Sequence, residues 1–106
     1  MYNNIINNLF EGKKSTEIPI WFLRQAGRHI PEYFSIRSKA QNFVDFCLNT
    51  ELIIESTMLP LKYYNIDAAI VFSDILMIPW AMKRNVKFTK DIGPSMDPMI
   101  PDETKI

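Results

Sequence analysis

Residues 24–28 have the sequence RQAGR, in which an arginine stands at each end of a short turn-forming run. Arg24 and Arg28 carry permanent positive charges on planar donor groups that match the geometry of carboxylates. Gly27 allows the backbone to turn in ways that other residues resist. Two interpretations are open at this point: a binding site for an anionic ligand, or a solvated loop that carries two surface charges.

Asp74 is the second residue in a chemically unusual setting. It stands between the apolar run AAIVF at residues 68–72 and the apolar run ILMI at residues 75–78. A carboxylate in apolar surroundings must be paired, hydrogen-bonded or functional, because desolvating a lone charge is costly. Two explanations of Asp74 are equally open: a structural role, as a helix cap or in an ion pair with a nearby arginine, or a role in a reaction.

Each of these groups follows a short, continuous apolar run of the kind that forms a strand buried on both faces. The runs are residues 18–23 and 68–72, and helical patterns lie between them. We therefore predict a βα unit that feeds a parallel sheet. Ligands bind at the carboxyl ends of such strands. The cationic run and Asp74 would then open on the same rim, where a ligand with both acidic groups and N–H donors fits.

Helical periodicity recurs over most of the remaining chain. The predicted helices cover residues 4–10, 31–39, 43–47 and 51–64. Asn49 or Thr50 would cap the last of these, and Pro60 would kink or break it because proline removes one helical hydrogen bond. Residues 86–88 are predicted as a short edge strand, and the chain from residue 90 onward as a loop punctuated by prolines.

The composition argues against several classes of partner. Lys plus Arg number 12 and Asp plus Glu number 12, so no net field attracts nucleic acid or an anionic membrane. The most apolar stretch, residues 66–82, contains Asp67, Asp74 and Pro79 and is short for a membrane helix of about 20 residues, so we predict buried interior of a soluble protein. The single cysteine, Cys47, cannot form an internal disulfide or hold a metal alone, and it agrees with a reducing cytoplasm.

Taken together, the motifs resemble those of the uroporphyrinogen decarboxylase family. That family has an apolar strand, then RQAGR, then Pro-Glu-aromatic, and later an Asp-Ala-Ala-Ile run that leads to Phe-Ser-Asp-Ile. This chain has WFLRQAGRHIPEY and, further on, IDAAIVFSDILMIPWAM. The match extends from about residue 18 to residue 94. It implies that residues 1–106 are an N-terminal fragment of an α/β (β/α)8 barrel, incomplete on its own, with residues 95–106 as a loop or truncated tail.

The resemblance implies a reaction as well as a fold. The family removes carbon dioxide from the four acetate side chains of uroporphyrinogen III, which gives coproporphyrinogen III in heme biosynthesis, and it needs no metal or other cofactor. Asp74 would accept hydrogen bonds from the pyrrole N–H groups, and Arg24 and Arg28 would hold substrate carboxylates, with one of them assisting proton delivery. The positions that the resemblance assigns to the substrate are Arg24, Gln25, Arg28, Tyr33, Arg37 and Asp74.

The resemblance also implies a cytoplasmic enzyme that commonly forms homodimers. A barrel of this type needs eight strands and about 250 residues, so we expect this chain to be inactive alone, as a truncated or split gene product would be. Two other classes stay open. One is a cobalamin-dependent methyltransferase, which shares the barrel and binds zinc through late His and Cys residues. The other is a non-catalytic remnant or a small tetrapyrrole-binding module.

Overall fold

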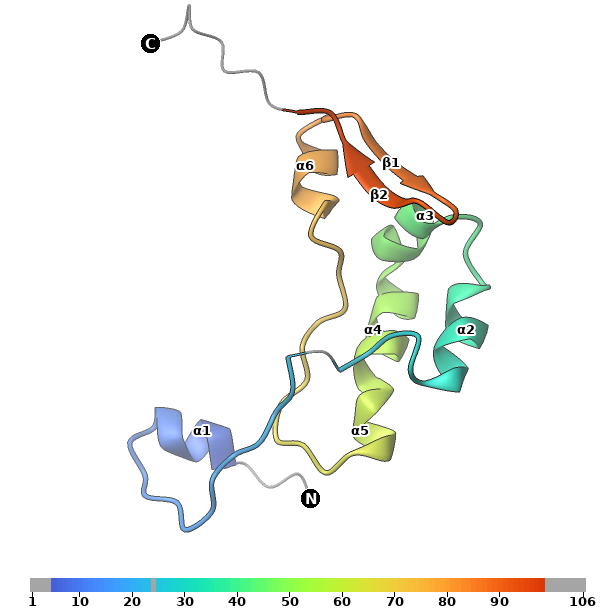
Figure 1. The fold of residues 1–106 in the computed structure, drawn as a ribbon. Helices are drawn as coiled ribbons and strands as arrows, with labels where there is room; N and C mark the ends of the chain where they lie inside the picture. Colours follow the sequence, from blue (N-terminus) through green and yellow to red (C-terminus); the bar gives the residue numbers. More distant parts are fainter. Residues whose placement is uncertain (1–4, 24, 99–106) are drawn as a thin grey trace, which may run out of the picture. The chain divides into compact units, whose positions relative to one another are not determined.

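The computed structural model describes residues 5–23 and 25–98 (Figure 1). They form two units that divide between Ser73 and Asp74. The first unit contains α1 (Ile5–Phe10), α2 (Pro31–Arg37), α3 (Phe43–Leu48), α4 (Thr50–Met58) and α5 (Pro60–Tyr63). The second contains α6 (Met77–Ala81), β1 (Val86–Thr89) and β2 (Gly93–Met96).

The helices of the first unit confirm the helical predictions, and their ends follow from local chemistry. Pro31 occupies the first turn of α2, where its missing N–H has no helical partner to lose. The Asn49 side chain accepts a hydrogen bond from the Leu52 N–H at 3.1 Å and so caps α4. Pro60 ends α4 and opens α5, so the helix predicted at residues 51–64 is broken as expected.

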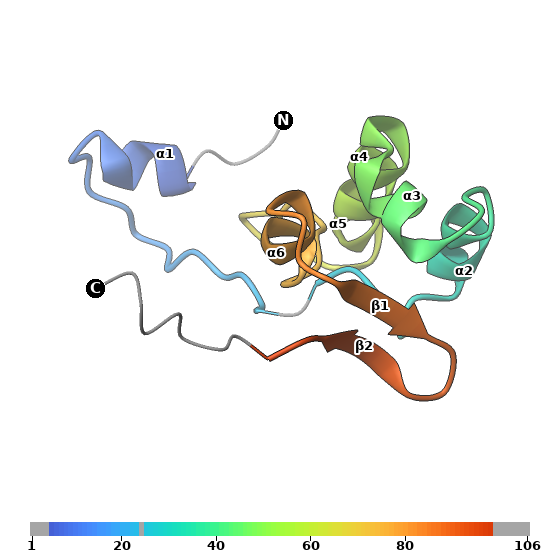
Figure 2. The ribbon, with the colours of Figure 1, turned by 90° about the horizontal axis from the view of Figure 1, so that it is seen from above.

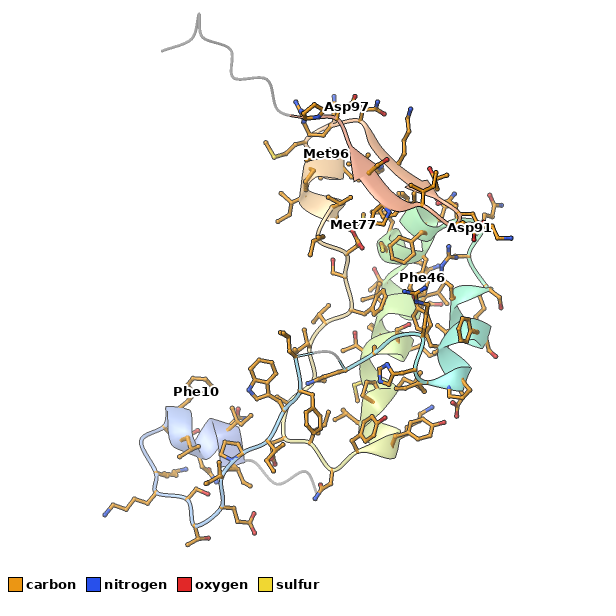
Figure 3. All side chains as sticks on the ribbon, viewed as in Figure 1. Phe10, Phe46, Met77, Asp91, Met96 and Asp97 are labelled. Atoms are coloured by element: carbon orange, nitrogen blue, oxygen red, sulfur yellow. The ribbon has the colours of Figure 1, made fainter. Side chains whose placement is uncertain are left out.

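Aromatic side chains from three parts of the first unit form its core. The rings of Tyr33 on α2, Phe46 on α3 and Phe72 lie with centroids 5.3–5.9 Å apart in all three pairs. Phe46 is fully buried, and Figure 3 labels it among the side chains of the first unit. Burial of such a side chain stabilises the fold by about 1.5–3 kcal/mol relative to leaving it in water. The other members of the cluster are Ile30, Ile36, Leu52 and Leu59, with Ala40, Phe43 and Cys47 packed against it.

The two segments predicted as strands are not strands in this structure. Within the described ranges no backbone hydrogen bond joins residues 18–23 to residues 68–72, although the N–H of Asp67, just before the second segment, donates to the Ile20 carbonyl oxygen at 2.8 Å. A strand ladder needs a repeated exchange of such bonds. Side chains next to the two segments bind their backbone instead: the Asp67 carboxylate binds the Ile20 N–H, and the Gln25 amide binds Ala68 and Ile70. Residues 18–23 and 68–72 therefore form no sheet here.

The prediction that these segments are buried on both faces is also wrong for this structure. Ile18 and Leu23 are each 86% exposed, and Val71 is 69% exposed. Ile75 and Ile78 of the second unit were also predicted to be interior, and they too are largely exposed. No element among the described residues covers these apolar side chains, and removal from water is what makes such a segment stable. Within the described ranges, no helix is long and apolar enough to cross a membrane.

The second unit is a short helix followed by a β-hairpin (Figure 2). β1 and β2 are antiparallel, with Val86 opposite Met96 and Thr89 opposite Gly93, which confirms the strand predicted at residues 86–88. The prediction of loop from residue 90 is wrong at β2. Asp91 and Gly93 have φ values of 68° and 91°, and left-handed residues of this kind let the chain reverse into a second strand.

Helix α6 was not predicted: residues 66–82 were assigned to buried interior, and no element was assigned to residues 77–81. Pro79 is the third residue of α6, where the backbone N–H has no intrahelical acceptor, so proline costs little there. Three predictions reach beyond the described residues: Asn4 as the start of the first helix, Arg24 in the cationic run, and residues 99–106 of the predicted tail.

Candidate functional site

Arg28 lies in an exposed turn that a glycine makes possible. The Ile30 N–H donates a hydrogen bond to the Gly27 carbonyl oxygen at 3.0 Å. Gly27 has a φ of 144°, a conformation that side chains with a Cβ rarely adopt. Arg28 has no ion-pair partner within the part of the chain that the structure describes. Its guanidinium group is therefore available to an anionic ligand, as the first of the two interpretations requires.

Gln25 is held quite differently from Arg28. It is 4% exposed, and its side-chain Nε2 donates a hydrogen bond to the Ala68 carbonyl oxygen at 2.8 Å. Its Oε1 accepts a hydrogen bond from the Ile70 N–H at 2.9 Å. Both ends of the amide thus bind the backbone that leads to Ser73 and Asp74. Direct contact between Gln25 and substrate stays a prediction.

Tyr33 and Arg37 share one face of α2 and meet the aromatic core. Tyr33 is 6% exposed, and burial is the main cause that raises the pKa of its phenol, while the positive charges of Arg37 and Arg28 act in the opposite direction. The Arg37 guanidinium lies 5.4 Å from the ring centroid of Phe43 and 5.5 Å from that of Phe46. This cation–π stacking orients Arg37 and contributes roughly 0.5–2 kcal/mol.

Asp74 begins the second unit and is half-buried. Its Oδ1 accepts a hydrogen bond from the Leu76 N–H at 2.8 Å, and its carbonyl oxygen accepts one from the Met77 N–H at 3.2 Å. A role as a helix cap therefore explains the position of Oδ1 of Asp74. Oδ2 has no hydrogen-bond partner in the described ranges. No arginine pairs with Asp74 within those ranges. The prediction that Asp74 and the arginines open on one rim concerns two units and stays a prediction.

Other features of the described chain offer less chemistry. An apolar hollow lies beside α1, lined by Ile6, Leu9, Phe10, Pro19 and Trp21, and none of these side chains can bind an anion through charge. In residues 5–23 and 25–98, no group of three or more His, Cys, Asp or Glu side chains is placed to hold a metal ion. Whether the reaction needs a cofactor is a separate question, and that expectation stays a prediction.

Two positioning contacts were not predicted. The Asp67 carboxylate accepts a hydrogen bond from the Ile20 N–H at 2.8 Å, and the Thr57 hydroxyl accepts one from the Phe72 N–H at 2.9 Å. A signal for Asp67 was present, since a carboxylate at the start of an apolar run must find a donor nearby. Thr57 gave no such signal, because a threonine within a helix usually faces solvent or its own helix backbone.

Comparison with known proteins gives one consistent result. The family model described as uroporphyrinogen decarboxylase (URO-D) matches residues 1–106. A uroporphyrinogen decarboxylase of Sinorhizobium fredii is 50% identical over 94 residues, which is 89% of this chain and 27% of that relative. One from Agrobacterium fabrum is 49% identical over 94 residues with the same two coverages. One from Rickettsia felis is 51% identical over 90 residues, 85% of this chain and 25% of that relative.

The chain thus spans about a quarter of the length of these curated relatives. The family folds as a TIM barrel, and the helices and two-stranded sheet seen here are consistent with part of an α/β protein of that kind. Because the family model matches the whole of the sequence and several relatives are about half identical to it, the chain belongs to the uroporphyrinogen decarboxylase family.

Proposed function

We propose that this chain is part of a cytoplasmic enzyme that decarboxylates the four acetate side chains of uroporphyrinogen III, giving coproporphyrinogen III in heme biosynthesis. The observation that carries the proposal is the 50% identity over 94 residues to a relative that bears the name of this activity. The exposed Arg28 supports it, since the substrate presents many carboxylates and a free guanidinium binds them well. The reaction needs no cofactor in this proposal.

The chemistry assigns a distinct task to each candidate residue. Loss of carbon dioxide breaks the bond between the carboxyl and methylene carbons of an acetate arm, and a protonated pyrrole ring takes up the electron pair of that bond. A proton then adds to the methylene carbon to form the methyl group, and the ring releases the proton that it had accepted. The Asp74 carboxylate accepts hydrogen bonds from the pyrrole N–H groups and stabilises the positive charge of the protonated ring. Arg28 and Arg24 hold carboxylates of the substrate, and one of them assists proton delivery.

Arg37 and Tyr33 form a second part of the proposed pocket, with different expected roles. Arg37 is stacked on two phenylalanine rings, which leaves its N–H donors to meet a carboxylate in a fixed direction. Tyr33 is buried in the core, so its ring shapes the pocket wall, and burial raises the pKa of its hydroxyl above the ordinary value. We propose that both positions bind substrate together with Gln25.

We also propose that catalysis requires barrel elements outside this chain. Residues 1–106 would supply an N-terminal part of the barrel, with residues 18–94 carrying the signature motifs and residues 95–106 leading out of them. The apolar side chains of Ile18, Leu23 and Val71 are largely exposed here. Neighbouring strands and helices of a barrel would remove them from water. Pairing of two completed barrels as a homodimer is part of the same proposal.

A segment-swap chimera tests the proposed activity. The matched 94-residue segment of the Sinorhizobium fredii relative is replaced by the corresponding segment of this chain. The chimera is incubated with uroporphyrinogen III, and the oxidised products are separated by the number of carboxylates they retain. We expect stepwise conversion to the four-carboxylate product. A chimera that melts cooperatively, like the parent relative, but converts no substrate would refute the proposal. The 106-residue chain alone is the matched control and is expected to be inactive.

A non-catalytic tetrapyrrole-binding module is the second candidate, and the exposure of Trp21 favours testing it. Trp21 is about half exposed, and so is Phe22, the next residue in the sequence. Saturable quenching of tryptophan fluorescence by uroporphyrinogen on the chain alone, without product formation, would support it. The cobalamin-dependent methyltransferase reading has no comparable support, since the matched relatives named above are decarboxylases. A bound-zinc assay on the chimera would test it.

A further inference from the structure

We propose that Gln25 is a positioning residue: its side-chain amide takes the place of one residue of a parallel strand and fixes the Arg28 turn onto residues 68–72. This inference goes beyond the expectation that Gln25 touches substrate. Its structural part stands on hydrogen bonds within the first unit. Its kinetic consequence rests on the proposed function.

The geometry of the Gln25 amide reproduces a strand pairing. In a parallel pair, one residue donates its N–H to the carbonyl of a partner residue and accepts from the N–H of the residue two positions later. Gln25 does the same with its side chain, since Nε2 donates to the Ala68 carbonyl and Oε1 accepts from the Ile70 N–H. Ala69 is the residue bridged. The amide therefore supplies both partners of a missing backbone unit.

The contacts around this bridge explain why it would set the position of Arg28. Arg28 lies between Gln25, which is buried, and Ile30, which is 2% exposed and part of the core cluster. The Gly27–Ile30 hydrogen bond closes the turn that presents it. With both ends of the turn anchored in protein, the Arg28 backbone has little freedom to move.

The segment that receives the bridge is itself fixed to the helices. The Phe72 N–H donates to the Thr57 hydroxyl of α4, and the Phe72 ring packs against Tyr33 and Phe46. The bridge thus ties the cationic turn to a segment that is already seated on the core. Gln25 is thereby tied to the backbone that precedes Ser73 in the sequence.

Three substitutions in the chimera separate the bridge from general stability. Gln25→Met has a similar length but neither donor nor acceptor. Gln25→Glu keeps an acceptor for the Ile70 N–H, yet its ionised carboxylate faces the Ala68 carbonyl oxygen, where a donor is required. Thr57→Val removes the neighbouring anchor of Phe72 and serves as the matched control, because its hydrogen bond lies outside the bridge.

Amide hydrogen exchange measures directly whether the Gln25 hydrogen bonds protect the backbone N–H groups. In the unsubstituted chimera we expect the Ile70, Phe72 and Ile30 amides to be protected. Gln25→Met should speed exchange at Ile70 and at Ile30, whose N–H closes the turn, by at least about tenfold. Thr57→Val should speed exchange at Phe72 and leave Ile30 unchanged. An unprotected Ile70 amide in the unsubstituted protein, or unaltered exchange at Ile70 or Ile30 in Gln25→Met, would overturn the proposal.

Kinetics then test the positioning role. A displaced Arg28 should lower kcat/KM of Gln25→Met by roughly 10- to 100-fold. The loss should lie mainly in KM, since a carboxylate anchor acts in the ground state as well as in the transition state. The kcat/KM of Gln25→Glu should rise toward that of the unsubstituted chimera as pH falls, because a protonated carboxyl group can donate to the Ala68 carbonyl again.

The outcomes of the two measurements are distinguishable. If the unsubstituted chimera folds but converts no substrate, the proposed function fails, and the exchange data alone decide the role of Gln25. If the chimera is active, normal KM in Gln25→Met or a pH-independent defect in Gln25→Glu would overturn the positioning role, even where the bridge itself is confirmed.

Discussion

Asp74 is the residue at which local structure and proposed chemistry can be separated by two substitutions. Its Oδ1 accepts the Leu76 N–H at 2.8 Å, just before α6 begins. Asp74→Asn keeps an amide oxygen for this hydrogen bond and removes the negative charge. Asp74→Ala removes both. A comparison of the two variants in the chimera therefore assigns any loss of activity either to the turn or to the charge.

The expected magnitudes follow from those two roles. Loss of a capping side chain costs about 1 kcal/mol of stability, so Asp74→Ala should be destabilised by that amount. Asp74→Asn should differ from the unsubstituted protein by no more than about 0.5 kcal/mol. Loss of a group that stabilises transition-state charge typically lowers kcat by roughly 10²- to 10³-fold. Both variants should show a loss of at least this size.

The assay measures kcat for uroporphyrinogen III and the free energy of unfolding in urea on the same preparations. The reasoning predicts that Asp74→Asn is folded, as stable as the parent chimera, and nearly inactive. Near-normal turnover in Asp74→Asn, together with a defect in Asp74→Ala, would show that the carboxylate serves the Leu76 turn alone. The electrostatic role would then have to be abandoned.

Three further predictions concern the first unit and use urea unfolding of the chimera. Phe46→Ala should destabilise by about 3–5 kcal/mol, because Phe46 is fully buried, whereas Phe34→Ala on the exposed side of α2 should cost less than about 1 kcal/mol; equal effects would contradict the core assignment. Burial raises the pKa of Tyr33 above its ordinary value of 10.0, so the unfolded chain releases this proton first and the free energy of unfolding should fall above pH 10. In Tyr33→Phe the free energy of unfolding should fall less steeply above pH 10. An unchanged dependence on pH would show that Tyr33 is not its cause. Asn49→Ala should cost about 1 kcal/mol through the lost cap on the Leu52 N–H, with Asn49→Asp restoring most of it.

Local chemistry made the helices of the first unit predictable. Pro31 and Asn49 define helix starts through interactions with residues close in sequence, and Pro60 defines a break for the same reason. Such signals need no knowledge of distant contacts. The motif residues were equally accessible, since a Gly beside two arginines and an aspartate within an apolar run are visible in the sequence alone.

The strands could not be predicted in the same way, because strand formation depends on partners that lie elsewhere. Residues 18–23 and 68–72 have the composition of buried strands, yet within the described residues no backbone hydrogen bond joins them. The hairpin shows the opposite case. β2 contains Gly93 and Pro94, which read as loop, and it forms a strand because β1 is adjacent to it across a turn with left-handed residues.

Side chains therefore supply some of the hydrogen bonds to the backbone that neighbouring strands would supply in a complete sheet. Asp67 binds the Ile20 N–H, Gln25 binds the backbone on both sides of Ala69, and Thr57 binds the Phe72 N–H. Each of these contacts gives a hydrogen-bond partner to a backbone group that no neighbouring strand pairs here. Asp67 holds Ile20, Gln25 holds Ala68 and Ile70, and Thr57 holds Phe72 against α4. The Gln25 contacts place the Arg28 turn beside residues 68–70 without a paired strand, which is why the Gln25 substitutions are the most direct test of how this motif is positioned.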